Sequence, residues 1–223
     1  MSDSACLEEL LRRRHSCRGF LDRPVPRETI AKILDIAQLT ASWCNAQPWQ
    51  LHIASGAALD RFRAALWSEA ASQPPRPDLP FPAEYVGVYL ERRRDCGWRL
   101  YDSIGVARGD RAASARQGRE NFRMFGAPHA AIVSTPASMG VYGAIDCGAY
   151  VSNFMLAAQS LGVASIAQAA LAAYPDLARH HLGIAADRAV VCGISFGYED
   201  ATHPANGFRT GRAPVGEAVT WLE

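Results

Sequence analysis

The chain has 223 residues, 49% of them hydrophobic, and a formal net charge of +1 at pH 7. This length and composition predict a single folded domain over residues 1–223 and exclude a disordered or fibrous protein. The near-neutral charge argues against a nucleic-acid partner and against binding to an anionic membrane surface, so any anion must be bound locally.

Helical and alternating apolar patterns predict the elements of the first half of the chain. These are a helix that ends near Arg14, a helix from about Arg27, a strand over 49–54 and a helix through 59–67. Residues 73–84 are rich in proline, and no second apolar core pattern follows them. They are therefore predicted to form a loop or the base of a lid, not a linker between domains.

The second half of the chain alternates helical and extended patterns. In order, the predicted elements are charged helices over 86–104 and 110–125, a strand over 130–134, an apolar helix over 146–161, a helix after Pro175 and a strand over 189–196. Helices outnumber strands, and only the later strands are separated by helices. The sequence thus predicts an α+β fold in which helices flank a small mixed β-sheet.

Residues 150–174 carry no charge and are about as long as a membrane span. Gly162 and several serine, asparagine and glutamine side chains interrupt the segment, which favours a buried helix up to Leu161 and then a short extended segment. A helix that is apolar on most of its surface must be covered, and in a domain of this size a second subunit is a natural cover.

The six cysteines are scattered, with no C-x-x-C pair and no His-x-x-x-His partner. This pattern argues against a metal site and against a disulfide framework. The N-terminus contains acidic residues and lacks the apolar core of a signal sequence, which predicts a cytoplasmic protein. The cysteines are Cys6, Cys17, Cys44, Cys96, Cys147 and Cys192.

Two polar clusters lie at opposite ends of the chain: Arg14-His15-Ser16-Cys17-Arg18, and a C-terminal segment that contains Arg212. Taken singly they are ordinary, because basic residues at a helix end complement the helix dipole and are solvated. Taken together, the three arginines and Ser16 supply the forked guanidinium and hydroxyl donors that bind a phosphate group, provided that the chain ends meet.

A third polar cluster, residues 42–49, reads Ser-Trp-Cys-Asn-Ala-Gln-Pro-Trp and joins a predicted helix to a predicted strand. Asn45 and Gln47 are suited to cap the preceding helix. Alternatively, Ser42 and Asn45 present hydrogen-bonding groups to the edge of a heteroaromatic ring. The sequence lacks a G-x-S-x-G elbow, a Walker loop, an H-E-x-x-H pair and G-x-G-x-x-G, so neither a catalytic nucleophile nor a metal is predicted.

In their order and spacing, the three clusters resemble the FMN-dependent nitroreductase family. Its members carry R-x-S-x-R/K near the start, P-S-x-x-N-x-Q-P-W about thirty residues later, and an arginine before a proline near the end. Residues 14–18, 42–49 and 212–214 stand in those places. Further matches are residues 121–128, 146–162 and 197–200, and residues 96–110 and 203–206 are most similar to the nitrobenzoate-reductase-like branch.

The resemblance implies an intertwined homodimer whose C-terminal tail extends over the partner, with one FMN in each of two interfacial sites. Arg14, Ser16 and Arg212 would hold the phosphate, and Arg18 would lie near the ribityl chain or the pyrimidine edge. The backbone N–H groups of residues 167–170 would approach flavin N5. The implied cofactor contacts within one chain are Arg14, His15, Ser16, Arg18, Ala167, Gln168, Ala169 and Arg212. Those from the other subunit are the loop residues Ser42, Trp43 and Asn45.

Two departures from the family pattern concern the flavin-facing backbone. Ala41 replaces the usual proline before Ser42, and Ile166-Ala167 replaces a segment that often carries proline before Gln168. Both predict a differently shaped backbone around the ring.

The resemblance also implies the reaction. Two electrons would pass from NAD(P)H through flavin N5 to a nitroaromatic or quinone-like acceptor by a ping-pong mechanism, with no obligatory catalytic side chain. Trp98, Tyr101 and Phe125 are candidates for the rim of the substrate pocket, although such aromatic residues are more often core residues. The alternatives are another reaction on the same fold (dehalogenation, flavin fragmentation or ene reduction) and a flavin-binding or sensing module without turnover.

Overall fold

The centre of the fold is the antiparallel pair β2 (His129–Pro136) and β4 (Arg188–Gly197). Both strands are largely apolar on both faces, the pattern of strands that are covered on each side. β1 (Gln50–Ser55) flanks β2 and β3 (Ala164–Gln168) flanks β4, so the order is β1-β2-β4-β3 with antiparallel ladders throughout. This computed structural model describes residues 2–223.

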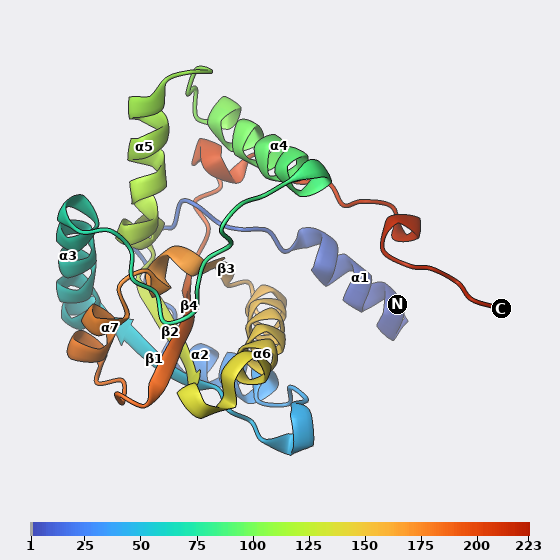
Figure 1. The fold of residues 1–223 in the computed structure, drawn as a ribbon, viewed down its shortest axis with the longest axis horizontal. Coiled ribbons are helices and arrows are strands. Elements are labelled where there is room, and N and C mark those ends of the chain that lie inside the picture. The colour runs from blue at the N-terminus through green and yellow to red at the C-terminus, as the bar shows by residue number, and fades with distance from the viewer. Residues whose placement is uncertain (1) are drawn as a thin grey trace.

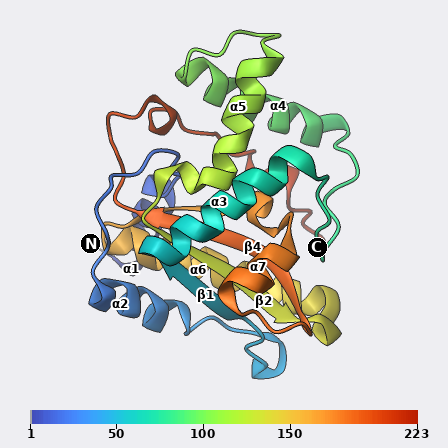
Figure 2. The same cartoon turned by 90° about the vertical axis from the view of Figure 1, so that its left-hand side faces the viewer.

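Helices cover both faces of the sheet (Figures 1 and 2). One face carries α2 (Arg27–Ala37) and α6 (Gly140–Ser160), and the other carries α3 (Gly56–Ser72) and α7 (Pro175–Leu182). Consecutive residues of β2 serve the two layers in turn: Val133 packs on the α6 side and its neighbour Ile132 on the α3 side. This alternation is the period of a strand.

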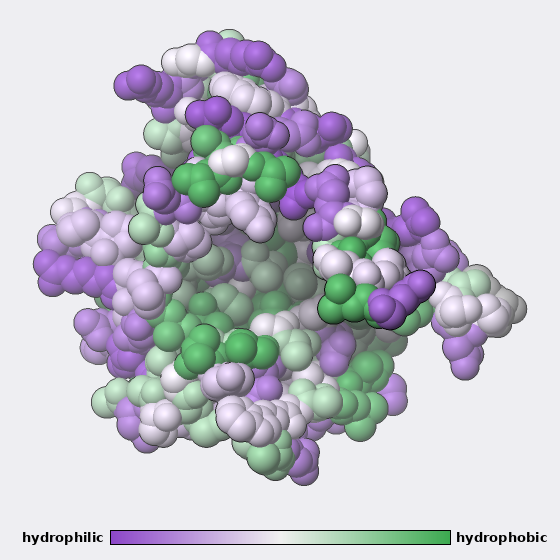
Figure 3. Space-filling view, turned by 45° about the vertical axis from the view of Figure 1, so that its right-hand side comes forward, coloured by the Kyte–Doolittle hydropathy of each residue, from purple (hydrophilic) through white to green (hydrophobic). Residues whose placement is uncertain are grey.

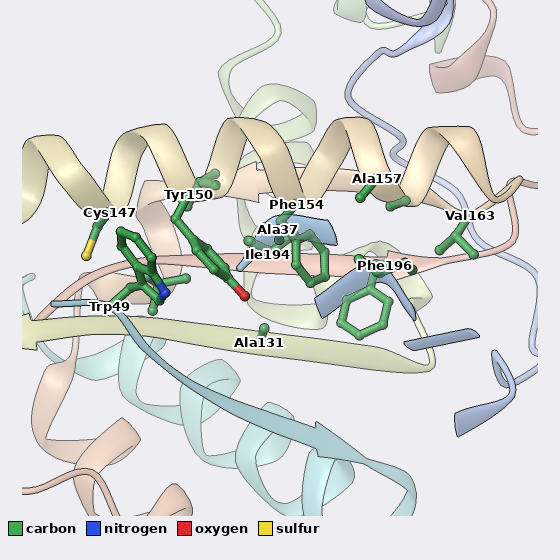
Figure 4. Close-up of a cluster of buried hydrophobic side chains, with 14 of the residues drawn as sticks. Ala37, Trp49, Ala131, Cys147, Tyr150, Phe154, Ala157, Val163, Ile194 and Phe196 are labelled. Atoms are coloured by element: carbon green, nitrogen blue, oxygen red, sulfur yellow. The ribbon is translucent and has the colours of Figure 1, made fainter. Parts of the chain in front are cut away.

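The α6 side of the core contains aromatic rings among smaller apolar side chains (Figure 4). Tyr150 and Phe154, four residues apart on α6, both point toward the sheet. The Tyr150 ring lies 5.0 Å from the Trp49 ring, and the Phe154 ring lies 5.4 Å from that of Phe196 on β4. The spacing of four residues places both aromatic rings on one side of the helix and leaves the opposite side free.

Three helices stand outside these layers and bury no residue fully: α1 (Asp3–Arg13), α4 (Gly87–Ser103) and α5 (Arg111–Arg119). α4 and α5 form an arm that projects from the sheet, and the C-terminal tail runs past α4 and ends away from the N-terminus (Figures 1 and 2). The tail is tied to the arm by an ion pair of 2.6 Å between Arg92 Nη2 and Glu217 Oε2.

Most of the predicted elements are confirmed, and three differ in detail. α6 begins at Gly140, earlier than the expected start at Asp146, and its first turn packs closely on β2, where Gly143 lies against Thr135. The predicted helix over 110–125 ends at Arg119 and continues as 3₁₀ turns over residues 120–126. The sheet is antiparallel, and its parallel component is confined to an isolated bridge.

Within residues 2–223, none of the helices has the length and apolar character needed to cross a bilayer. The uncharged segment 150–174 is instead divided between α6, β3 and short turns. Its helical part packs on the sheet as part of the core.

His129, at the start of β2, is held as a neutral imidazole. Its Nε2 accepts a hydrogen bond of 2.8 Å from the Val25 N–H, so Nδ1 donates its proton to Ser55 Oγ at 2.6 Å. Burial lowers the pKa of His129 below its ordinary value. Protonation would break the Val25 contact and place a charge among apolar side chains.

Because the folded-state pKa is depressed, His129 contributes stability above its unfolded pKa of about 6.5, and this contribution is lost as pH falls through the folded-state pKa. We expect the free energy of unfolding to decline from about pH 7 to pH 5, and to decline less in His129→Gln. Urea unfolding across this range measures both slopes. A residual slope is expected from His52, whose pKa is lowered by burial and by Arg188. Equal slopes in the two proteins would contradict the prediction.

Candidate functional site

The segment that follows α1 lies along the free edge of β3. Ser16 forms a parallel bridge with Ser165, and the Cys17 N–H donates to the Ser165 carbonyl at 3.2 Å. Phe20 then bridges Glu199, just beyond β4. The first polar cluster is therefore fixed at the end of the sheet where β2 begins.

Asn206 joins the C-terminal segment to the same place. Its Oδ1 accepts from the Arg18 N–H at 2.7 Å, and its Nδ2 donates to the carbonyls of Gly19 and Asp200, both at 2.9 Å. The side chain is buried and has all three contacts inside the protein. The two ends of the chain thus meet, which was the condition for a shared phosphate site.

Arg14 lies near enough to Arg212 for their charges to interact. Burial lowers the pKa of the Arg14 guanidinium, and the charge of Arg212 lowers it further. Within residues 2–223 neither forms an ion pair, and Arg212 donates only to Thr210 and to the Gly211 carbonyl. In contrast, Arg12 and Arg13 pair with Glu8 and Glu9 along α1. Two neighbouring cations without a carboxylate, together with the Ser16 hydroxyl, fit the phosphate of FMN.

Arg18 and His15 have their own partners. The Arg18 guanidinium donates to the Ser16 carbonyl at 3.3 Å and lies 5.8 Å from the centre of the Phe208 ring, and burial lowers its pKa. His15 contacts Glu199 through Nε2 at 3.1 Å and the Arg13 carbonyl through Nδ1 at 3.2 Å. Both ring nitrogens of His15 are thus occupied by protein groups, so it orders the segment next to Arg14.

Beyond Arg18 opens a cavity of about 700 Å³, lined by α5, the loop that precedes it, the 3₁₀ turns over residues 120–126, and residues 203–204. Of the predicted substrate residues, Phe125 lines it, whereas Trp98 and Tyr101 on α4 pack against each other with ring centres 5.9 Å apart. The space-filling view shows a broader hollow below the arm, with apolar residues in and around it (Figure 3).

Sequence reasoning missed several charged residues of this cavity. They are Asp110, Arg116, Glu120 and Arg123. Asp110 caps α5 by accepting from the Ala113 N–H at 2.8 Å, and Glu120 lies 3.5 Å from Arg123. The resemblance of residues 121–128 to the family pattern pointed to this part of the chain, but it did not assign a role to Arg123.

The end of β3 presents backbone groups at the same edge. Because the Ser165 carbonyl points outward to Cys17, the alternation of the ladder also directs the N–H and C=O of Ala167 away from β4. Ala167 and Ala169 are exposed, whereas Gln168 is buried. The Gln168 side chain is committed inside the protein: Nε2 donates to Asn121 Oδ1 at 3.2 Å and to its carbonyl at 3.0 Å, and Oε1 accepts from Ser195.

The loop over residues 42–47 lies at the other end of the sheet from the first polar cluster. It precedes Gln50, which pairs with Ser134 near the end of β2, whereas Ser165 is aligned through Phe196 with His129 at the start of β2. Five residues of strand separate the two ends by about 17 Å. The structure therefore holds Arg14, Ser16 and Arg18 at one end of the sheet, with Arg212 near Arg14, and it does not bring Ser42, Trp43 or Asn45 to that end within one chain.

Burial keeps the site cysteine inert. It raises the pKa of the Cys17 thiol to about 12, and the Sγ–H donates to the Gly19 carbonyl at 3.2 Å. A thiol held in this way is not ionised at neutral pH and is a poor nucleophile. Cys17 is therefore not a candidate for a reactive thiol at this edge.

The fold and the cluster at the sheet edge define a nitroreductase. The chain belongs to the nitroreductase family, whose sequence model matches residues 11–198. It is 38% identical over 213 residues to nitroreductase NfnB of Mycolicibacterium smegmatis, covering 95% of this chain and 91% of the relative. It is 33% identical over 224 residues to 4-nitrobenzoate reductase of Nocardioides sp., covering 96% and 89%.

The fold is confirmed by a solved structure. The FMN-dependent nitroreductase NfnB from Mycobacterium smegmatis, in complex with NADPH, superposes with a TM-score of 0.93 at 37% identity and covers 99% of this chain and 100% of that one. The predicted fold class and family are thus confirmed, including the likeness to nitrobenzoate reductases.

Proposed function

We propose that the protein is an FMN-dependent oxidoreductase that takes two electrons from NAD(P)H and passes them to nitroaromatic or quinone-like acceptors. The observation that carries the proposal is the pair Arg14 and Arg212, two neighbouring guanidinium groups with no carboxylate partner within residues 2–223. Relatives named as FMN- and NADPH-dependent nitroreductases support the same reaction.

When bound, FMN supplies the chemistry, by accepting hydride at N5 and passing two electrons to the acceptor. The protein residues bind and orient: Arg14, Ser16 and Arg212 hold the phosphate, and Arg18 places its charge near the pyrimidine edge. The outward N–H of Ala167 would be available to donate to the ring, and Phe125 would help to exclude water from the cavity. Donor and acceptor use the same space in turn, which gives ping-pong kinetics with protons from solvent.

We also propose that the working unit is a homodimer. The phosphate-binding residues and the loop 42–47 lie at opposite ends of the sheet in one chain, so a second copy is needed to bring them together. The side of α6 that faces away from the sheet is apolar and open, with Val141 67% and Ile145 57% exposed. At the end of the tail, Trp221 and Leu222 are 84% and 92% exposed, which suits a tail that packs on a partner.

We place the whole chain in one domain and in the cytoplasm. Both core clusters share the strands of a single sheet, so no boundary divides residues 2–223. The six cysteines are free thiols, which fits a reducing compartment.

Anaerobic absorbance of the purified protein tests the proposed reaction. Protein loaded with FMN should be yellow, lose its flavin band on addition of NADPH or NADH, and regain it when 4-nitrobenzoate or a quinone is added. A protein that stays colourless after incubation with FMN would exclude the site. A yellow protein that no nicotinamide bleaches would favour the binding or sensing module, and one that is bleached yet reoxidised only by a halogenated or ene acceptor would favour another reaction on this fold.

A further inference from the structure

The loop over residues 42–47 is held in a strained backbone conformation. Cys44, Asn45 and Gln47 have positive φ values of 52°, 56° and 48°, in the left-handed region that favours glycine. Within residues 2–223, the other non-glycine residues in this region are Met124 and Phe125, beside the cavity. Strain of this kind persists only where the surroundings hold it, and it is concentrated at functional sites.

Hydrogen bonds from Gln38, at the end of α2, fix the second half of the loop. Gln38 Nε2 donates to Gln47 Oε1 at 3.0 Å, and Gln38 Oε1 accepts from Trp49 Nε1 at 3.1 Å. The Gln47 amide then donates to Asn45 Oδ1 at 3.0 Å and to the Asn45 carbonyl at 3.2 Å. The chain of amides fixes residues 45–47 relative to β1.

A hydrogen bond to Asp146, on α6, fixes the first half of the loop. Asp146 Oδ1 accepts from the Trp43 N–H at 3.2 Å, and the Asp146 side chain is 7% exposed. Its second oxygen, Oδ2, has no hydrogen-bond partner within residues 2–223. Burying a carboxylate with an oxygen that lacks a hydrogen bond lowers the stability of the fold. Stability alone therefore does not explain this residue. The Trp43 ring, 60% exposed, lies 4.5 Å from the Tyr142 ring on the same helix.

We propose that Asp146 is a positioning residue that sets the backbone of residues 42–47 from beneath, so that this loop completes the flavin site of a second copy of the chain. A hydrogen bond to a carboxylate is roughly twice as strong as one to a neutral acceptor, which suits a contact that must hold a strained segment. The position of Asp146 inside the helix that also carries the open apolar face couples the loop to the dimer contact. The inference rests on the proposed function.

The test compares Asp146→Ala and Asp146→Asn with the matched control Cys147→Ala, which removes a buried side chain from the next position of α6. The Cys147 thiol contacts the Ser134 carbonyl and not the loop. Two quantities are measured on the full-length protein: amide hydrogen exchange of residues 42–47 without FMN, and the FMN dissociation constant by quenching of flavin fluorescence.

In Asp146→Ala we expect faster exchange confined to the loop and a dissociation constant raised about tenfold or more, since a charged hydrogen-bond partner is lost. Asp146→Asn keeps an acceptor for the Trp43 N–H and should restore most of the affinity and the protection. Cys147→Ala should lower the melting temperature yet leave both loop readouts unchanged. Unchanged amide exchange of the loop in Asp146→Ala would overturn the proposal. A loss of loop protection and FMN affinity in Cys147→Ala equal to that in Asp146→Ala would also overturn it.

The outcomes separate this proposal from the proposed function. If the wild-type protein fails to bind FMN, the proposed function is wrong, and the exchange measurement still decides whether Asp146 holds the loop. If the wild type binds FMN but Asp146→Ala binds it equally well, the function stands and the positioning role is wrong.

Discussion

Replacing both Arg14 and Arg212 by alanine is expected to weaken FMN binding roughly 100-fold. Loss of one charged hydrogen-bond partner costs about 1.5 to 3 kcal/mol, which is about tenfold or more for each single variant. The loss of binding free energy in the double variant should be smaller than the sum of the losses in the two single variants. A bound phosphate also relieves the repulsion between the two guanidinium groups, and each single variant already removes that repulsion. Equilibrium dialysis or flavin fluorescence measures the dissociation constants.

The matched control for this prediction is Arg13→Ala, because Arg13 is the neighbour of Arg14 and is paired on the surface of α1 with Glu9. Its FMN affinity should be close to that of the wild type. The apo forms give a second check: removing Arg212 relieves repulsion on Arg14, so apo Arg212→Ala should melt no lower than the apo wild type. FMN retention by the double variant equal to that of Arg13→Ala would refute the phosphate assignment.

Ile145→Glu is expected to separate the dimer and remove FMN from both sites. Ile145 is 57% exposed in one chain, in the middle of the open apolar side of α6, so the substitution leaves the fold of the monomer intact. In a two-fold contact the new charge is buried twice, at several kcal/mol each, which raises the dimer dissociation constant by roughly three orders of magnitude or more. Sedimentation at micromolar concentration and flavin content measure the two effects.

Ala58→Glu is the control, since it adds the same charge at an exposed position of α3, on the opposite side of the sheet. This variant should remain dimeric and yellow. An Ile145→Glu protein that stays dimeric with full FMN would show that α6 is not the contact surface.

The sequence was sufficient to predict most of the elements and the family. The apolar stripe from Arg27 predicted α2, which begins there, and the run before Phe196 predicted β4. The arginines and Ser16 predicted an anion site, because guanidinium and hydroxyl groups bind phosphate wherever they converge. Local pattern and side-chain chemistry are properties that a single sequence carries directly.

What the sequence could not provide arises from contacts between distant residues. In the early part of α6, Gly143 lies closely against Thr135 of β2, a contact that no local propensity reports. The helix over 110–125 ends early in a segment where Asn121 is held by Gln168, forty-seven positions away. The role of Asn206, which joins Arg18 to the C-terminal segment, likewise depends on where the two chain ends meet.

The register of the sheet adds the conclusion that matters most for function. The sequence places the loop 42–47 close to residues 14–18 along the chain, yet β1 and β3 carry them to opposite ends of the sheet. In the proposed site, a second copy of the chain would bring the loop next to Arg14 and Arg212. The flavin site would then be shared between two subunits.

Mixed dimers test this claim most directly. One chain carries Arg14→Ala with Arg212→Ala, the other carries Ser42→Ala with Asn45→Ala, and each is purified alone and as a tagged heterodimer. Both homodimers should bind FMN weakly. The heterodimer should regain one tight FMN, because one of its two sites combines intact arginines from one chain with an intact loop from the other. A heterodimer that binds FMN no better than the two homodimers would contradict a site shared between subunits.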